Sequence, residues 1–169
     1  MKETVISFSG HRKLGNKVLA VEVFLVTIIR HLIETHDKVT FIFGGALGVD
    51  TMASEIALKL RDEYPHKDVH VHLYLPCVGF ESVWQERDRQ VLYSQMEKAN
   101  FWKYVDERNY IAPYQLMNRN KAMVNDSVGT VAVWNGSKSG TSNCVQYAKQ
   151  KARHLLIYNP NTGETRRDA

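Results

Sequence analysis

Three short segments of the sequence contain glycine, and two of them add hydroxyl and basic residues, a combination that can hold an anionic ligand. They are 9–12 (SGHR), 44–50 (GGALGVD) and 135–141 (NGSKSGT). Glycine allows the backbone to approach a ligand closely and to aim its N–H groups at it. A helix that begins directly afterwards presents the positive end of its dipole to the same ligand. These segments therefore indicate a phosphate-binding site.

The run Ser139-Gly140-Thr141 is the strongest candidate, because it combines backbone donors, two hydroxyl groups and a predicted helix N-terminus, with Lys138 beside it. Serine, glycine and threonine are also the ordinary residues of turns and helix caps. Both interpretations, a phosphate cradle and a plain helix cap, stay open at this point.

One carboxylate and two guanidinium groups could complete such a site. Asp50 either caps the helix that follows it or accepts a hydrogen bond from a ribose hydroxyl. Arg12 and Arg119 could neutralise phosphate through bidentate contacts, although most arginines are simply solvated. The position of Arg12, directly after a predicted strand, favours the functional interpretation.

The standard fingerprints of several nucleotide and metal sites are missing. Residues 10–17 look like a P-loop, but no Ser or Thr follows Lys17, and no G-x-G-x-x-G follows the first predicted strand. These absences count against a kinase or ATPase cradle and against a dehydrogenase. His70 and His72 share one face of a strand without an HExxH motif or paired cysteines, so no metal site is predicted.

The elements that must position these residues follow from the hydrophobic pattern, which alternates between strands and helices. Strands are expected at residues 5–8, 39–43, 69–75, 100–105, 128–134 and 154–158. Helices are expected at residues 17–35, 50–63, 82–98, 114–125 and 141–152. This alternation predicts a Rossmann-like, doubly wound α/β fold, in which a mostly parallel sheet carries helices on both faces. Ligands of such folds bind beyond the carboxyl ends of the strands, where all three segments fall.

Length and charge are consistent with that fold. The chain has 169 residues, 22 Lys and Arg against 18 Asp and Glu, and a net charge of +4, which favours anionic partners without requiring nucleic acid. We expect a single domain over residues 1–158 and a frayed tail over 159–169, with Pro76 ending the third strand.

The sequence also bears on the cellular compartment. Charged and polar residues interrupt the most apolar stretch, 18–33, so no membrane-spanning segment is predicted. The absence of a signal-peptide pattern and the presence of only two cysteines favour a cytoplasmic location.

Several motifs, taken in order along nearly the whole chain, resemble the SLOG superfamily. This Rossmann-like group includes the lonely-guy phosphoribohydrolases and DNA-processing protein A, and the resemblance is closest to YspA-related members of bacteria and phages. The motifs are SGHR at 9–12, GGALGVD at 44–50, Pro76 followed by Trp84, Arg119-Asn120 with Met123, and Trp134-Asn135-Gly136 with Gly140-Thr141. The resemblance implies a nucleotide or nucleotide derivative in the crevice, a homodimer or higher homo-oligomer, and the host cytoplasm for a phage-encoded member.

The phosphoribohydrolase branch of the superfamily differs from this chain at one important position. Its arginine corresponds to Arg119, but its lysine is replaced by Asn120 and its glutamate position falls on Cys144. Without that carboxylate, the group expected to promote departure of the base is missing. Whether the chain is an enzyme stays open, with Arg119 and Asp50 as catalytic candidates and Glu55 as another substitute carboxylate.

The leading hypothesis is a protein that binds a nucleotide-derived small molecule, such as an ADP-ribose-like signalling nucleotide, for sensing or sequestration. No other cofactor is predicted. The residues predicted to contact the ligand are Ser9, Gly10, His11, Arg12, Gly44, Gly45, Ala46, Gly48, Asp50, Pro76, Trp84, Arg119, Asn120, Gly136, Ser139, Gly140 and Thr141. Cleavage of an N-glycosidic bond ranks second. Single-stranded nucleic-acid binding ranks third, because basic and aromatic residues are scattered rather than contiguous.

Overall fold

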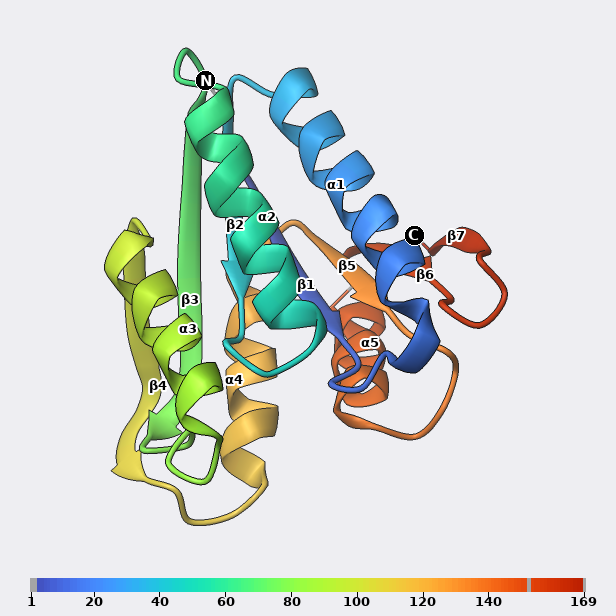
Figure 1. Cartoon of the computed structure of the whole chain (residues 1–169). Helices are drawn as coiled ribbons and strands as arrows, with labels where there is room; N and C mark the ends of the chain where they lie inside the picture. The colour runs from blue at the N-terminus through green and yellow to red at the C-terminus, as the bar shows by residue number, and fades with distance from the viewer. Residues whose placement is uncertain (1–2, 152, 169) are drawn as a thin grey trace.

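A seven-stranded sheet with the order β4-β3-β2-β1-β5-β6-β7 separates two helical layers (Figure 1). The computed structural model describes residues 3–151 and 153–168. The strands are β1 (Thr4–Gly10), β2 (Lys38–Phe43), β3 (Asp68–Val78), β4 (Phe101–Asn109), β5 (Gly129–Val133), β6 (His154–Tyr158) and β7 (Thr165–Asp168). The helices are α1 (Val18–Thr35), α2 (Val49–Glu63), α3 (Glu86–Lys98), α4 (Tyr114–Asn125) and α5 (Gly140–Gln150), with a 3-10 turn, η1 (Gly15–Lys17), before α1. All neighbouring strands are parallel except β6 and β7, which confirms the predicted Rossmann-like α/β fold.

The helices cover both faces of the sheet. Helices α1, α2 and α3 lie in front of the strands in Figure 1, and α4 and α5 lie behind them. The chain steps outward from β1 through β2 and β3 to β4, and then crosses back to place β5 on the other side of β1. Such a reversal of direction leaves a crevice at the carboxyl ends of the two strands, the usual ligand site of doubly wound folds.

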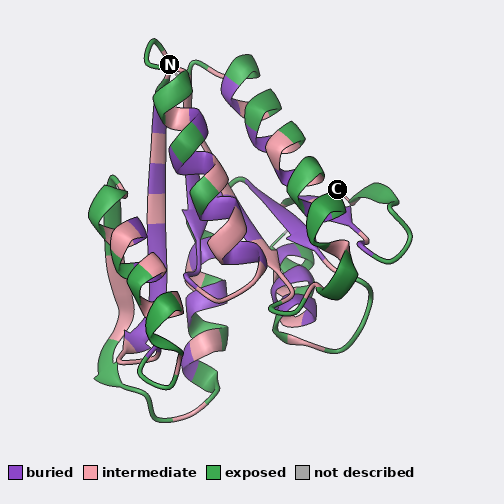
Figure 2. Ribbon diagram, viewed as in Figure 1, coloured by how far each residue is buried: buried purple, intermediate pink, exposed green. Residues whose placement is uncertain are grey.

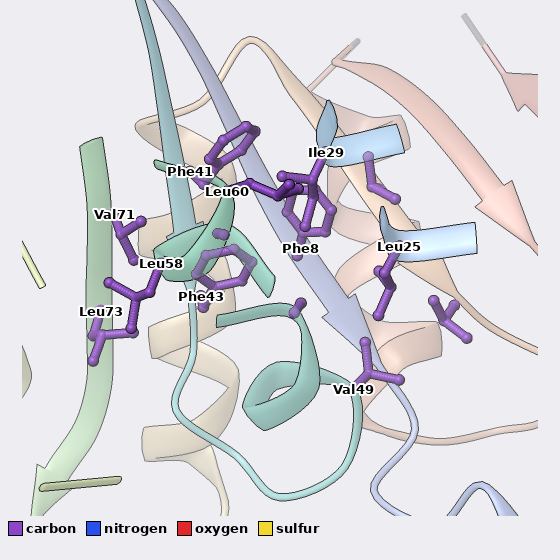
Figure 3. Close-up of a cluster of buried hydrophobic side chains, with 14 of the residues drawn as sticks. Phe8, Leu25, Ile29, Phe41, Phe43, Val49, Leu58, Leu60, Val71 and Leu73 are labelled. Carbon is purple, nitrogen blue, oxygen red and sulfur yellow. The ribbon is translucent and has the colours of Figure 1, made fainter. Parts of the chain in front are cut away.

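The core follows the two-residue period of the strands and the helical period of α1. In β2, Phe41 and Phe43 face the layer of α1 and α2, whereas Ile42 packs against Met123 on the opposite face. Figure 3 shows the cluster of buried side chains that contains Phe8, Phe41 and Phe43. Figure 2 shows that burial is concentrated on the central strands and the inner sides of the helices. The buried residues of α1 recur every four positions and are Val21, Leu25, Ile29 and Ile33. Burial of each such side chain contributes about 1.5–3 kcal/mol to the free energy of folding.

A buried pair of hydroxyl groups fixes the register of the two strands at the reversal. Ser7 and Thr130 are register partners in β1 and β5, and their side-chain oxygens lie 2.8 Å apart. Ser127 adds a second buried contact to Ser7 at 3.1 Å. A slip of one residue would leave these hydroxyls unpaired in the interior, so the network favours one alignment of β1 and β5.

Strand β3 continues through Pro76 to Val78, whereas the sequence predicts that Pro76 ends the strand. The last register pair between β3 and β2 joins Leu73 to Phe43. Pro76 lies beyond that pair, so its missing N–H removes no ladder bond with β2.

The C-terminal segment also differs from its prediction. Residues 159–169 are expected to be frayed, but Thr165–Asp168 forms β7, antiparallel to β6. An ion pair between Lys149 Nζ and Asp168 Oδ2, at 3.3 Å, ties this strand to α5. Residues 1–2, 152 and 169, which the domain and helix predictions include, lie outside the described residues. Within the described part of the chain, no helix has the length and apolar character needed to cross a membrane.

Candidate functional site

A cavity of about 460 Å³, the main cavity, opens where the carboxyl end of β1 and the loop after β2 meet the first turns of α2 and α5 and one face of α4. Its lining residues are Phe8, Ser9, Gly10, His11, Arg12, Ala46, Asp50, Pro113, Leu116, Met117, Arg119, Asn120, Met123, Ser139, Gly140 and Thr141. Residues predicted for the site from four separate parts of the chain therefore surround one space.

The turn before α2 is pressed against the end of β1. Gly48 has a φ of +82°, and a Cβ on it would lie 2.4 Å from the carbonyl oxygen of Arg12. The N–H of Val49 donates to the carbonyl of His11 at 3.1 Å, which holds the two segments together. Glycine is required at residue 48 because of both its conformation and this close approach. The contact places His11 and Arg12 at the rim of the main cavity.

Asp50 is the second residue of α2, and its carboxylate closes the preceding turn. The N–H of Ala46 donates to Asp50 Oδ2 at 3.1 Å, while the helix N-cap is Gly48, so Asp50 does not cap the helix. Its second oxygen, Oδ1, is buried and has no hydrogen-bond partner among the described residues. Burial raises the pKa of the Asp50 carboxyl, and the nearby charge of Arg119 opposes the shift.

Arg119 extends from α4 into the same cavity and is almost completely buried. Its Nη1 donates to the carbonyl of Gly44, and its Nε donates to Asn120 Oδ1 at 2.9 Å. Burial lowers the pKa of the guanidinium, and the charge of Asp50 counteracts this effect. No ion pair within 4.0 Å joins Arg119 to a carboxylate in the described residues, so its charge is held in place without being neutralised by contact.

The N-terminus of α5 is capped but keeps two donors. Ser139 Oγ accepts the N–H of Ser142, and Ser142 Oγ accepts the N–H of Ser139, which forms a reciprocal capping box. The N–H groups of Gly140 and Thr141 have no partner among the described residues, as expected for the first turn of a helix. The segment is therefore both an ordinary cap and a set of backbone donors at the cavity wall.

His11 connects the end of β1 to the loop that leads into α5. The N–H of Asn135 donates to His11 Nε2 at 3.0 Å, so the imidazole is neutral in this arrangement. Burial lowers the pKa of His11, which keeps that neutral form. The hydrogen bond fixes the loop that precedes Ser139, Gly140 and Thr141.

A second hollow, of about 320 Å³, adjoins the main cavity and shares Arg12, Ala46, Leu116 and Arg119 with it. Pro76 and Trp84, both predicted for the site, line this hollow instead of the main cavity. The site therefore has two compartments that meet at the two arginines.

Four predicted glycines lie outside both compartments. Gly44 and Gly45 pack against side chains, since a Cβ on them would lie 2.7 Å from Arg119 Nη1 and 2.5 Å from Leu75 Cδ2 respectively. Gly48 contacts the backbone of the β1 end, as described above. Gly136 lines a separate hollow with Trp134 and residues of β6 and β7. These glycines shape the surroundings of the site and are not part of its lining.

Glu55, the other substitute carboxylate, and Cys144, at the glutamate position of the phosphoribohydrolases, both lie outside the main cavity. Glu55 is exposed on α2, where its Oε1 accepts a hydrogen bond from Gln95 at 2.9 Å, and it does not line either compartment. Cys144 is buried behind the cavity wall, and burial raises the pKa of its thiol to about 11. Asp50 is thus the carboxyl group of the main-cavity lining.

The sequence analysis missed the apolar wall of the main cavity, which consists of Phe8, Pro113, Leu116, Met117 and Met123. A signal was present, because Leu116 and Met123 stand three residues before and four residues after Arg119 and so share its helical face. It also missed Phe80 and Tyr110 in the second hollow, which follow β3 and β4 without a recognisable motif. In the described residues, no group of three or more His, Cys, Asp or Glu side chains is placed to hold a metal ion.

Comparisons with known proteins agree with the fold and the motifs. Residues 10–160 match the family described as the YspA SLOG family. The chain is 34% identical over 150 residues to the SPbeta prophage-derived protein YoqJ of Bacillus subtilis, covering 82% of this chain and 81% of that protein. It is 31% identical over 143 residues to a UPF0398 protein of Halalkalibacterium halodurans, covering 84% and 72% respectively.

Among solved structures, the chain is similar to DNA processing protein A of Helicobacter pylori, whose structure is described by its single-stranded DNA binding mode. The TM-score is 0.65 at 20% identity, over 91% of this chain and 64% of that chain, so the present chain spans slightly less than two thirds of it. This likeness shows a shared fold. The family match over residues 10–160 confirms the resemblance stated from the motifs. The chain belongs to the YspA SLOG family.

Proposed function

We propose that the main cavity binds a nucleotide or a nucleotide-derived small molecule, for sensing or sequestration. One observation carries the proposal: a buried cation, Arg119, and Asp50, a buried carboxyl group whose Oδ1 has no hydrogen-bond partner, line the same cavity without forming an ion pair among the described residues. Buried polar groups are ordinarily satisfied, and leaving one unpaired costs about 1–3 kcal/mol. A ligand that offers an anion to Arg119 and a hydroxyl to Asp50 would satisfy both groups.

Phosphate fits the cationic side of the cavity. The free N–H groups of Gly140 and Thr141 lie at the positive end of α5, and Arg119 lines the same cavity. Arg12, which is exposed at the rim, adds a second guanidinium. Backbone donors together with arginines are a favourable environment for a phosphate group.

A sugar hydroxyl fits the acidic side. Asp50 Oδ1 is an acceptor without a partner in the described residues, whereas Asp50 Oδ2 already accepts the N–H of Ala46. A ribose hydroxyl is a donor of the right kind, and the apolar wall of Leu116, Met117 and Met123 suits the body of a sugar or base. Phosphate and ribose together define a nucleotide.

Hydrolysis of the N-glycosidic bond is the second candidate function, and one observation favours it. Asp50 is a buried carboxyl whose raised pKa would help it to act as a proton donor. Cys144, which occupies the glutamate position of the phosphoribohydrolases, is a buried thiol and supplies no carboxylate. We therefore rank binding without cleavage first, and we expect no free adenine when the protein is incubated with adenosine 5′-monophosphate and the products are separated by chromatography.

Single-stranded DNA binding, which the description of the Helicobacter relative mentions for that protein, ranks third here. The cations and aromatic rings of the site lie in two hollows instead of forming a continuous track. We also expect a cytoplasmic location and a homo-oligomer, as inferred from the sequence and the family resemblance.

Isothermal titration of the whole chain with a panel of nucleoside mono- and diphosphates and ADP-ribose tests the proposal. Two variants at one position make a matched pair. A Cβ at Gly140 meets no atom within 4 Å, so Gly140→Ala and Gly140→Asp should both fold, and an aspartate in the first turn suits the helix dipole. Gly140→Ala should keep affinity, whereas Gly140→Asp should lose about 10-fold or more through charge repulsion with phosphate. The proposal is overturned if no member of the panel binds with submillimolar affinity, or if the two variants bind with equal affinity.

A further inference from the structure

The second hollow has a different chemical character from the main cavity. Its outer wall consists of the aromatic and aliphatic side chains of Phe80, Val83, Trp84 and Tyr110, which we call the aromatic wall. Arg12 and Arg119 also line it, and both are among the four residues that it shares with the main cavity. A molecule that fills both compartments would therefore have both guanidinium groups and the aromatic rings among its neighbours.

The aromatic wall is held by its own loop. Phe80 and Trp84 pack edge to face, with ring centroids 5.4 Å apart and an interplanar angle of 87°. The N–H of Trp84 donates to the carbonyl of Glu81 at 3.0 Å, and Arg89 Nη1 donates to the carbonyl of Trp84. These contacts within the chain hold the loop after β3 in place. A surface that is already ordered loses little entropy when it binds.

Two residues of the aromatic wall leave much of their apolar surface exposed. Val83 is 88% exposed and Tyr110 is 53% exposed, although both line a hollow. Covering them with a planar apolar group would remove that surface from water. Nucleobases stack on aromatic side chains regardless of base identity, so a base is a suitable group.

We propose that the second hollow holds the base of the ligand, so that the two compartments together bind a nucleoside phosphate with its base against Phe80 and Trp84. The arginines then lie between the base and the phosphate bound at α5, where they can contact a second phosphate group or the ribose. This proposal rests on the proposed function of the main cavity, and it adds the orientation of the ligand and the requirement for a planar base.

The test compares ADP-ribose, which has a base, with ribose 5-phosphate, which has none, by isothermal titration against the whole chain. The wild-type protein should bind ADP-ribose at least about 10-fold more tightly than ribose 5-phosphate. Trp84→Ala should weaken the binding of ADP-ribose by about 10-fold and leave the affinity for ribose 5-phosphate unchanged, because it removes a stacking surface for the base and no contact to phosphate or ribose. Trp84→Phe should restore about half or more of the lost affinity, because it keeps an aromatic face.

Two controls separate stacking from general damage. Trp102→Ala changes a tryptophan on β4 that is 40% exposed and lines neither compartment, so it should leave both affinities unchanged. Tyr110→Ala alters an exposed residue of the aromatic wall and should lower the affinity for ADP-ribose but not that for ribose 5-phosphate. This variant keeps the test decisive even if Trp84→Ala folds poorly.

The possible results distinguish this inference from the function on which it rests. If the wild-type protein binds ADP-ribose and the Gly140→Asp variant loses it, while Trp84→Ala and Tyr110→Ala have no effect, the phosphate site stands and the base site is wrong. A parallel loss of both ligands in Trp84→Ala and Tyr110→Ala would also overturn the base site, because it would show a general structural role. If the wild-type protein binds neither of these ligands nor any other member of the nucleotide panel, both proposals fail.

Discussion

The guanidinium of Arg119 lies against the α-carbon of Gly44, so closely that a Cβ at residue 44 would come within 2.7 Å of Nη1 and 2.8 Å of Cζ. Nη1 also donates to the carbonyl of Gly44. The glycine that follows β2 therefore serves to seat an arginine from α4, a residue 75 positions away along the chain. This contact connects the GGALGVD segment to the cationic side of the main cavity.

Gly44→Ala should displace Arg119 without unfolding the protein. The obstructing atoms belong to the end of a flexible side chain, and Gly44 does not have a positive φ, so the backbone can accept alanine. A displaced Arg119 would lose its charge-assisted contact with the phosphate of the ligand, which is worth about 1.5–3 kcal/mol, so we expect nucleotide affinity to fall by about 10-fold or more. Titration calorimetry together with thermal unfolding checks this, with Gly140→Ala as the control. An unchanged affinity would show that the position of Arg119 is unimportant for binding.

Gly48→Ala should instead destabilise the whole fold. The φ of +82° costs a residue with a Cβ about 1–3 kcal/mol, and the Cβ would also meet the carbonyl oxygen of Arg12 at 2.4 Å. Backbone atoms cannot move aside as a side-chain end can, so the cost should exceed the strain alone. Gly15→Ala provides the control, because Gly15 has a φ of +54° and open space around its Cβ position. Urea unfolding should show a larger loss for residue 48 than for residue 15, and equal losses would contradict the close approach.

Asp50→Asn should stabilise the protein at neutral pH. The folded state raises the pKa of this carboxyl above its ordinary value of 3.8, mainly through burial, so the folded protein holds the proton more tightly than the unfolded chain. Stability from this group is present below pH 3.8 and is lost as the pH rises through the raised pKa. Asparagine keeps an acceptor for the Ala46 N–H and carries no charge. The melting temperature of the variant should exceed that of the wild type at pH 7, and the difference should shrink as the pH falls toward 4. A variant that melts lower at pH 7 would mean that Arg119 outweighs the cost of burial.

The sequence was sufficient for the order of elements where the hydrophobic period is strong. Residues 114–125 and 154–158 were predicted with the bounds that the structure has for α4 and β6. Strand β7 was missed because Thr165, Arg166 and Arg167 show no apolar alternation, and its pairing with β6 depends on backbone groups at a sheet edge. The sequence wrongly predicts that Pro76 ends the third strand. The pairing of β3 with β2 ends before Pro76, so the proline breaks no hydrogen bond between these strands. Where that pairing ends is a property of the sheet and not of the local sequence.

The candidate site, like the fold, could be predicted from the sequence only in part. The fold brings the ends of β1 and β2 and the start of α5 to one edge, so the convergence of Ser9, Asp50 and Gly140 could be anticipated from strand order. The roles of individual residues could not. Whether a glycine such as Gly44 contacts a ligand or makes room for Arg119 depends on contacts between segments far apart in the chain. The aromatic wall was anticipated only at Trp84, because Tyr110 lies in a loop that is held by hydrogen bonds of its neighbours Asn109 and Ile111 with Gln115 of α4.

His11 should titrate below its ordinary pKa and lose its link to Asn135 in acid. The N–H of Asn135 donates to Nε2, and a protonated imidazole cannot accept that bond. Because burial lowers the folded-state pKa below 6.5, the contribution of His11 to stability is complete above pH 6.5 and is lost as the pH falls through the lowered value. His11→Gln keeps an acceptor that does not titrate, so its stability should depend less on pH in that window.

Proton NMR of the His11 ring gives its pKa directly, and exchange of the Asn135 amide reports the hydrogen bond. We expect a pKa below 6.5 in the free protein, with faster amide exchange once the imidazole is protonated. Since His11 lines the main cavity, a bound phosphate should raise that pKa through its negative charge. A value at or above 6.5 in the free protein would contradict the neutral imidazole, whereas a low value that ADP-ribose leaves unchanged would place the phosphate away from His11.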